Sequence, residues 1–207
     1  PALHAPLRQA ELPLAELERR LHRDYNTAER VPRYFVLNGR SFPYTLLDSQ
    51  IEVRPDETVL LRVLNAGARP LSLHLHGHHP EAVAVDGTPI PPERRLAQDT
   101  FTLTSGQRLD LALDTRADGV HASGPGVWLI HDHSPQAVTT DGVNPGGDIA
   151  YIVYEEYIDV YGLPTVPGDL SKDFAPSYYR GEDPVFEGPA YRAVAATGAA
   201  GRAAPWE

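Results

Sequence analysis

Residues 70–80 read PLSLHLHGHHP and hold four of the nine histidines in the whole sequence. In a β-strand, side chains two positions apart face the same side, about 6.7 Å apart along the chain. A strand here would therefore project His74 and His76 together. A second run, GVWLIHDH at residues 126–133, would present His131 and His133 in the same way. Two such pairs on neighbouring strands would bring four imidazoles to one patch.

Imidazole nitrogens are ligands for copper, zinc and iron, at about 2.0–2.1 Å. A single H-x-H pair is more typical of ordinary surface or core histidines. Two pairs, both in strand context, predict a metal site formed by His74, His76, His131 and His133. The spacing leaves the number of ions open, because the side chains can lean together on one metal or stand upright and serve two.

Three neighbouring residues are weaker candidates. His78 and His79 follow the first pair in a predicted turn, where a histidine is usually solvated or hydrogen-bonded. We keep His78 as a possible additional ligand. Asp86, in VDGTP, has the character of a turn residue. A carboxylate near the cluster would alternatively relay protons.

The central part of the chain predicts an all-β fold. From Tyr34 to about Glu156, alternating or β-branched runs are separated by Gly, Pro, Asn and Asp, with no helical periodicity between them. Seven to nine short strands of this kind favour a Greek-key β-sandwich. The runs are RYFVLNG, QIEVRPDETVLLRVLNAG, LSLHLHG, EAVAVDG, DTFTLTSGQRLDLALDTRADG, GVWLIHDH and DIAYIVYEEY.

The flanking segments differ in composition from the sandwich. Residues 1–32 form an N-terminal extension in which LPLAELERRLHR, residues 12–23, predicts a short amphipathic helix. The domain itself spans residues 33–157. Residues 158–207 are rich in Pro and Gly with scattered aromatics. We expect a long irregular arm that packs on the sandwich or on a neighbouring subunit, with plain disorder as the alternative.

Composition excludes several classes of protein. The net charge of −10 argues against nucleic acid as a partner, because polyanion binding needs clustered Lys and Arg. No apolar run approaches the roughly 20 residues of a membrane span. The sequence contains no Cys and no Met, which excludes disulfides and zinc–thiolate sites. The absence of oxidisable sulfur suits an oxidising, copper-exposed compartment. Compositional drift towards an Arg-rich, Lys-poor sequence would also explain the absence of Cys and Met.

HLHGHHPEAVAVDG, followed by GVWLIHDH and then by PGG and YIVYEE, resembles the cupredoxin domains of multicopper oxidases. The terminal domain is the most similar, and the resemblance covers about residues 33–157. It implies a cupredoxin-like fold and copper as the cofactor. It also implies that the two H-x-H pairs supply type 2 and type 3 copper ligands. In that family they form half of a trinuclear cluster that reduces dioxygen, and a second domain supplies the other half.

The chain departs from that family at its blue-copper positions. These read Leu71, Asp132, Ala137 and, with less certain alignment, Asp148. As a set they do not suit a soft, thiolate-based copper site, so type 1 copper is lost from this domain. Alternation along the strand points Asp132 away from its flanking histidines. We expect a buried carboxylate capped by hydrogen bonds, or one that orients the copper ligands.

Three functions fit these residues. The first is a copper-dependent oxidoreductase whose electrons enter through a site outside this chain. The second is a copper-binding module for storage, delivery or assembly. The third is a hydrolytic zinc site with an activated water. For either copper function we expect a periplasmic or extracytoplasmic location.

The expected partner is a further copy of the chain or a second cupredoxin domain or subunit. The chain itself is not expected to be membrane-embedded, although a membrane-anchored partner or preceding segment is compatible with it. The start at Pro1 fits either a processed export product or an excised domain.

Overall fold

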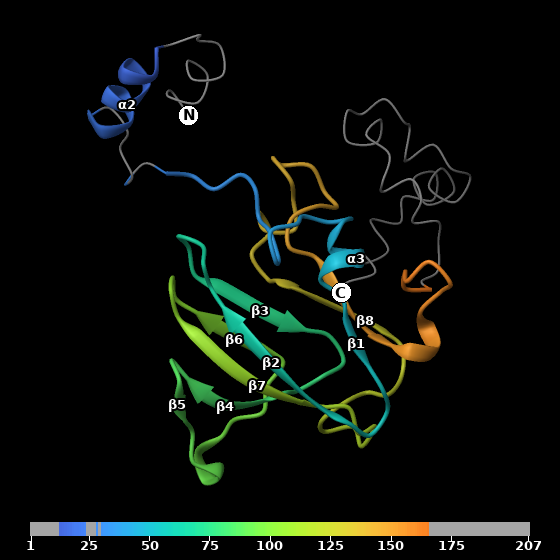
Figure 1. The fold of residues 1–207 in the computed structure, drawn as a ribbon. Coiled ribbons are helices and arrows are strands. Elements are labelled where there is room, and N and C mark those ends of the chain that lie inside the picture. The colour runs from blue at the N-terminus through green and yellow to red at the C-terminus, as the bar shows by residue number, and fades with distance from the viewer. Residues whose placement is uncertain (1–12, 24–27, 29, 166–207) are drawn as a thin grey trace, which may run out of the picture. The chain divides into compact units, whose positions relative to one another are not determined.

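The computed structural model describes residues 13–23, 28 and 30–165, and the chain divides into two units, Pro1–Arg33 and Tyr34–Glu207 (Figure 1). In the first unit, helix α2 spans Leu14–Arg23, within the predicted residues 12–23. Glu16 accepts hydrogen bonds from Arg19 and Arg20 one turn later. Of the predicted C-terminal arm, residues 166–207 lie outside the described part. No helix among the described residues is long and apolar enough to cross a membrane.

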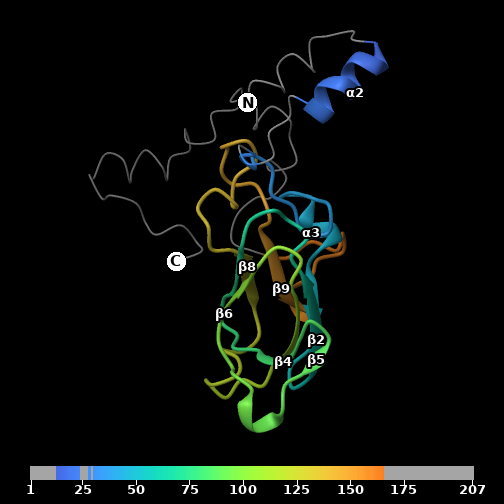
Figure 2. The ribbon, with the colours of Figure 1, turned by 90° about the vertical axis from the view of Figure 1, so that its left-hand side faces the viewer.

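The second unit is built on two β-sheets. One is five-stranded, in the order β1-β9-β8-β3-β6, and the other is four-stranded, in the order β2-β7-β4-β5. Figure 2 shows β8 and β9 of the first sheet together with β2, β4 and β5 of the second. The strands are β1 Ile51–Val53, β2 Thr58–Leu64, β3 Leu71–Leu75, β4 Glu81–Val85, β5 Thr88–Pro89, β6 Thr100–Leu103, β7 Arg108–Asp114, β8 Val127–Asp132 and β9 Ala150–Tyr154.

The connections make this a cupredoxin-like sandwich, as predicted. β1 lies in the first sheet, β2 in the second and β3 in the first again, so the chain crosses between the sheets at successive strands. β1 pairs in parallel with β9, while β3 pairs antiparallel with both β6 and β8. β3 and β8, which carry the two H-x-H motifs, are therefore direct neighbours although they lie far apart in the sequence.

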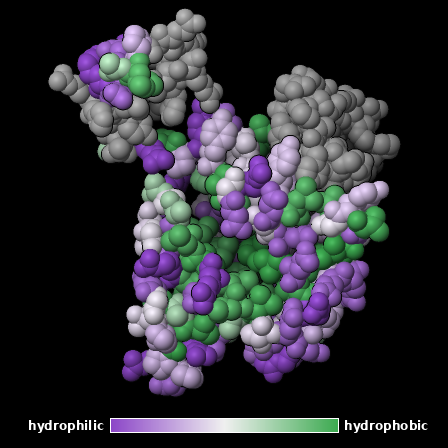
Figure 3. All heavy atoms as spheres, in the orientation of Figure 1, coloured by the Kyte–Doolittle hydropathy of each residue, from purple (hydrophilic) through white to green (hydrophobic). Residues whose placement is uncertain are grey.

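Strict alternation along the strands creates the core. In β7, Leu109, Leu111 and Leu113 are buried, while the intervening side chains are only partly covered or exposed. Leu73 and Leu75 of β3 are buried between the sheets by the same alternation. On the face drawn in Figure 3, hydrophobic side chains gather in the middle of the strand region, with hydrophilic ones around them. This core holds β3 and β8 in place.

Two local predictions were wrong. Residues 33–39 form no strand and make only isolated bridges. Asn38 and Gly39 have φ of 49° and 83°, and Leu37 bonds to Arg40 across them, which is the geometry of a tight two-residue turn. Helix α3, Thr45–Asp48, was not predicted. Leu46 of this helix is fully buried in a second small core, because tertiary packing rather than periodicity holds so short a helix.

Candidate metal centre

The register of β3 against β8 gathers the four predicted histidines. His74 lies directly opposite His131 in the ladder, and His76 donates its N–H to the carbonyl of Leu129. His133, just after β8, donates its N–H to the carbonyl of Ser72. The imidazole ring centres are 4.5–5.6 Å apart in every pair that makes contact.

The four rings line a cavity of about 660 Å³. Leu129 and Ile149, which belong to the small second core, form part of its wall. His131 is buried and His133 is exposed, so the cluster extends from the protein interior to the surface. The remaining lining residues are Leu75, Gly77, His79, Asp99, Asp132, Ser134, Pro135 and Val138.

Hydrogen bonds orient the rings. His74 Nδ1 lies 2.8 Å from Thr100 Oγ1, and His131 Nδ1 lies 2.9 Å from the carbonyl oxygen of Asp132. A carbonyl only accepts, so His131 Nδ1 carries the proton and its Nε2 is left bare. These bonds fix ring orientation in the way that partners behind metal-ligating histidines do.

His76 Nε2 and His131 Nε2 are 3.2 Å apart. Two nitrogens that ligate one ion at about 2.0–2.1 Å, about 100° apart, are separated by about 3.2 Å. The donor set therefore fits a metal that accepts imidazole ligands, and the ligand type suits copper. Among the described residues, no three His, Asp or Glu side chains already surround one point as ligands of a single ion.

Burial keeps two of these rings, His76 and His131, neutral. Burial, reinforced by the neighbouring His74 and His131, lowers the pKa of His76 to about 4. Burial also lowers the pKa of His131, although the hydrogen bond to the Asp132 carbonyl opposes this. Because only neutral imidazole can bind a metal, both residues are ready ligands at neutral pH.

The structure does not bring His78 to the cavity. Its side chain is fully buried, with Nδ1 2.9 Å from the carbonyl oxygen of His76 and Nε2 3.1 Å from the hydroxyl of Tyr154. Both ring nitrogens of His78, which the sequence suggested as a possible further ligand, thus have hydrogen-bond partners within the protein. His79 is exposed and lines the cavity. Sequence reasoning gave Tyr154 no role, and only its place in an aromatic-rich strand was visible.

The structure also places Asp86 away from the cluster. With φ of 49°, it forms the turn between β4 and β5 together with Gly87, in the sheet opposite the histidines. Its Oδ1 accepts the backbone N–H of Arg108. Asp-Gly is a strong signal for such a hairpin turn, and that local preference decided its position. Asp99, which the sequence did not single out, instead lines the cavity, with Oδ2 4.0 Å from His74 Nδ1.

Three of the positions that the resemblance assigns to a blue-copper site, Asp132, Ala137 and Asp148, lie together. Asp132 and Asp148 are buried, and Asp148 Oδ1 accepts the N–H of Asp132 at 3.3 Å. Asp132 Oδ1 in turn accepts the N–H groups of Ser72 and Ser134, so Asp132 is a buried, hydrogen-bonded carboxylate, as alternation predicted. Asp148 donates its N–H to the carbonyl of Ala137. Burial raises the pKa of Asp148 to about 7, and the Asp132 charge also raises it.

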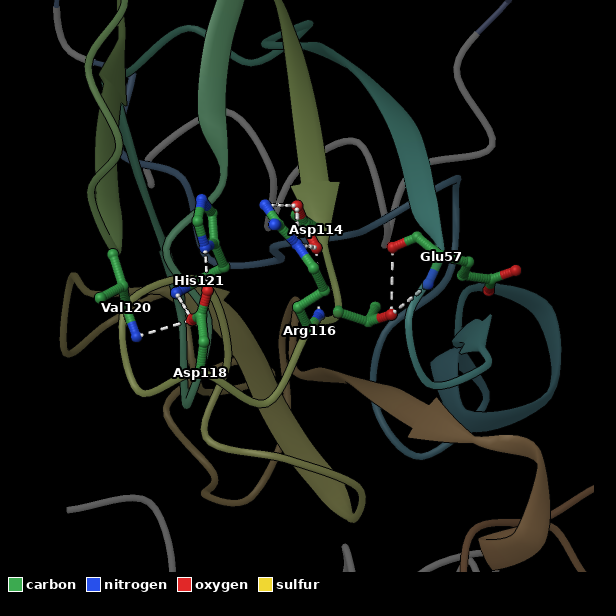
Figure 4. A network of polar contacts seen from close by, with 7 residues as sticks. Glu57, Asp114, Arg116, Asp118, Val120 and His121 are labelled. Carbon is green, nitrogen blue, oxygen red and sulfur yellow. Dashed lines mark hydrogen bonds and ion pairs between the residues drawn. The ribbon is translucent and has the colours of Figure 1, made fainter.

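A polar network flanks the turn after β3 (Figure 4). Asp118 accepts the backbone N–H groups of Val120 and His121 and the ring N–H of His121, which hold the pKa of its carboxyl well below the usual range. The carbonyl of His121 accepts the N–H of His79. His121 is thus a structural residue of this loop, and the loop supports the rim of the cavity.

Known proteins match this chain over most of its described length. Residues 12–156 match the family model for multicopper oxidases. The curated iron transport multicopper oxidase FET3 of Gibberella zeae is 26% identical over 162 residues, which are 66% of this chain and 24% of that protein. The chain therefore spans about a quarter of that relative.

Two solved structures share the fold. The blue copper oxidase of Nitrosomonas europaea has a TM-score of 0.58 and 24% identity, covering 84% of this chain and 56% of that one. The multicopper oxidase mgLAC has a TM-score of 0.56 and 26% identity, covering 83% and 56% respectively. The chain thus spans just over half of each.

Proposed function

Because the chain belongs to the multicopper oxidase family, we propose that it is a copper-binding cupredoxin domain of a copper-dependent oxidoreductase. Copper is the cofactor that the family implies. We assign His74, His76, His131 and His133 as ligands of type 2/type 3-like copper. The observation that carries this assignment is the 3.2 Å separation of His76 Nε2 and His131 Nε2 inside a cavity lined by all four rings.

The chain's own residues prepare this site in three ways. Burial keeps His76 and His131 neutral. Hydrogen bonds to the Nδ1 atoms of His74 and His131 turn their Nε2 atoms towards an ion. The apolar side chains of Leu129 and Ile149 form part of the cavity wall beside them. Copper bound there would supply one-electron redox chemistry.

The domain would lack type 1 copper. No Cys or Met exists anywhere in the sequence, and the corresponding positions hold Leu71, Asp132, Ala137 and Asp148. Electrons would therefore enter from a donor outside this chain. The same feature favours a second candidate function, a non-catalytic module for copper storage, delivery or assembly, because such a module needs no donor.

We further propose that the histidine face meets a second cupredoxin domain or another copy of the chain. One chain offers only two H-x-H pairs, and the exposed His133 places the cluster at the surface. Symmetric self-association is a common way to supply a second copy of a surface. We propose a periplasmic or extracytoplasmic location, in keeping with a copper-loaded, sulfur-free chain.

Copper loading tests the assignment. The full chain should bind copper and show the electron paramagnetic resonance signal of nitrogen-ligated Cu(II) without an intense blue colour. A strong thiolate-type absorption, tighter binding of zinc than of copper, or ligands other than these histidines would overturn it. Light scattering of the loaded protein tests the partner proposal, and oxygen consumption with an added electron donor separates the oxidoreductase from the storage module.

A further inference from the structure

The residue just behind the cavity, His78, links one proposed ligand to a distant strand. Its Nδ1 is 2.9 Å from the carbonyl oxygen of His76, and its Nε2 is 3.1 Å from the hydroxyl of Tyr154, the last residue of β9. His78 and Tyr154 are both fully buried. The contact therefore spans from the turn after β3 to a strand that is not its neighbour in the sheet.

Hydrogen-bond chemistry sets the direction of this link. The carbonyl of His76 can only accept, so Nδ1 of His78 carries the ring proton. In the neutral ring Nε2 is then bare and accepts the hydroxyl proton of Tyr154. The link is thus a directed chain from Tyr154 through His78 to the backbone of His76.

The turn that carries His76 is also held from its other sides. Gly77 has φ of 64°, and a Cβ there would lie 2.3 Å from the indole of Trp128. The carbonyl of Gly77 accepts the N–H of Ser123. The N–H of His76 is bonded to Leu129, so both of its backbone polar groups are occupied. Only the side chain of His76 is left to reach into the cavity.

We propose that His78 and Tyr154 are positioning residues that hold His76 in place for metal binding, an inference that rests on the proposed copper site. We call the hydrogen-bonded pair His78 and Tyr154 the brace. It keeps His76 Nε2 close to His131 Nε2 before a metal binds. Partners behind metal ligands typically change metal affinity by about 10–100-fold when they are removed. His78 therefore belongs to the site without touching the metal.

Three variants of the full chain test the brace by copper affinity, measured by competition with a chelator. His78→Phe keeps a buried ring and loses both hydrogen bonds, so affinity should fall about 10–100-fold. His78→Asn keeps an amide N–H near the Nδ1 position and should recover part of that loss. Tyr154→Phe removes one hydroxyl and should cost less than His78→Phe. Wild-type affinity in both phenylalanine variants would overturn the proposal.

A matched control separates positioning from general loosening. Leu111→Ala empties a fully buried position in the opposite sheet and should destabilise the fold while leaving copper affinity unchanged. The Cu(II) electron paramagnetic resonance spectrum should change in His78→Phe and not in Leu111→Ala. Equal losses of affinity in the two variants would overturn the brace. If His78→Phe does not fold, Tyr154→Phe decides the question alone.

A measurement on the metal-free protein tests the positioning role of His78 and Tyr154 separately from copper binding. Because His131 Nε2 is bare, the proton between it and His76 Nε2 belongs to His76. Its nuclear magnetic resonance signal should be protected from exchange in the wild type and lost in His78→Phe. If the wild type binds no copper, the proposed function fails while this signal still tests the brace. An unchanged signal in His78→Phe would overturn the brace.

Discussion

The histidine cluster and the neighbouring buried acid pair, Asp132 and Asp148, respond to burial in opposite directions. Burial lowers the pKa of His76 and His131 but raises that of Asp148. In each case the neutral form is favoured, because a charge loses its hydration inside the protein. Neutral imidazole is a metal ligand, whereas a protonated carboxyl is a poor one. Burial thus favours the metal-binding form of the histidines and the protonated form of Asp148.

The largest expected effect is the loss of copper when two of the histidines are removed. The double variant His131→Ala with His133→Ala should lose bound copper and still fold, because the strand region buries enough apolar surface to be stable without a metal. Metal content after dialysis and a thermal melt would measure both properties. The control His121→Ala removes an imidazole outside the cavity and should retain copper. Loss of cooperative unfolding in the double variant would contradict this expectation.

Asp148 of the acid pair should make the free energy of unfolding depend on pH. Folded Asp148 keeps its proton to about pH 7, whereas an unfolded Asp loses it near 3.8. The folded state binds more protons between these values, so this group lowers the free energy of unfolding as pH rises from about 4 to 7, by about 4 kcal/mol at most. Asp148→Asn should remove that slope and be more stable than the wild type at pH 8. Urea denaturation at pH 4 and pH 8 measures it, and identical slopes would argue against a raised pKa.

A smaller effect concerns the orientation of one ligand. Thr100→Val removes the hydroxyl 2.8 Å from His74 Nδ1, and copper affinity should fall about tenfold. The matched control is Thr102→Val on the same strand, whose hydroxyl instead lies 3.4 Å from that of Ser72. Chelator competition on both variants measures the difference. If the two variants lose equally, the Thr100 hydroxyl does not orient His74.

The smallest effect is expected at Asp86. Asn tolerates a positive φ and can accept the N–H of Arg108, so Asp86→Asn should change stability by less than about 0.5 kcal/mol. Copper affinity should be unchanged, because this turn lies in the sheet opposite the histidines. Chelator competition and urea denaturation provide the measurements. Slower oxygen consumption in this variant would restore the proton-relay interpretation.

Local patterns in the sequence were enough to predict the sandwich and its two histidine-bearing strands. Period-two alternation identified β3 and β8 and put the members of each H-x-H pair on one side. The same patterns failed at residues 33–39, where an Asn-Gly turn competes with extension, and at α3, which is too short to show periodicity. At residues 33–39 the local turn decided the outcome, whereas at α3 the burial of Leu46 in the second core did.

By itself the sequence determined which candidate ligands exist: imidazoles in two H-x-H pairs, and no Cys or Met anywhere. Only the tertiary structure decided how they are used. The register that sets His74 opposite His131 and brings His76 within 3.2 Å of His131 depends on strands more than fifty residues apart. His78 turned inward because Tyr154 offers its buried ring a partner. Spacing along a chain reports which side of a strand a residue faces, whereas contacts between strands depend on how the whole core packs.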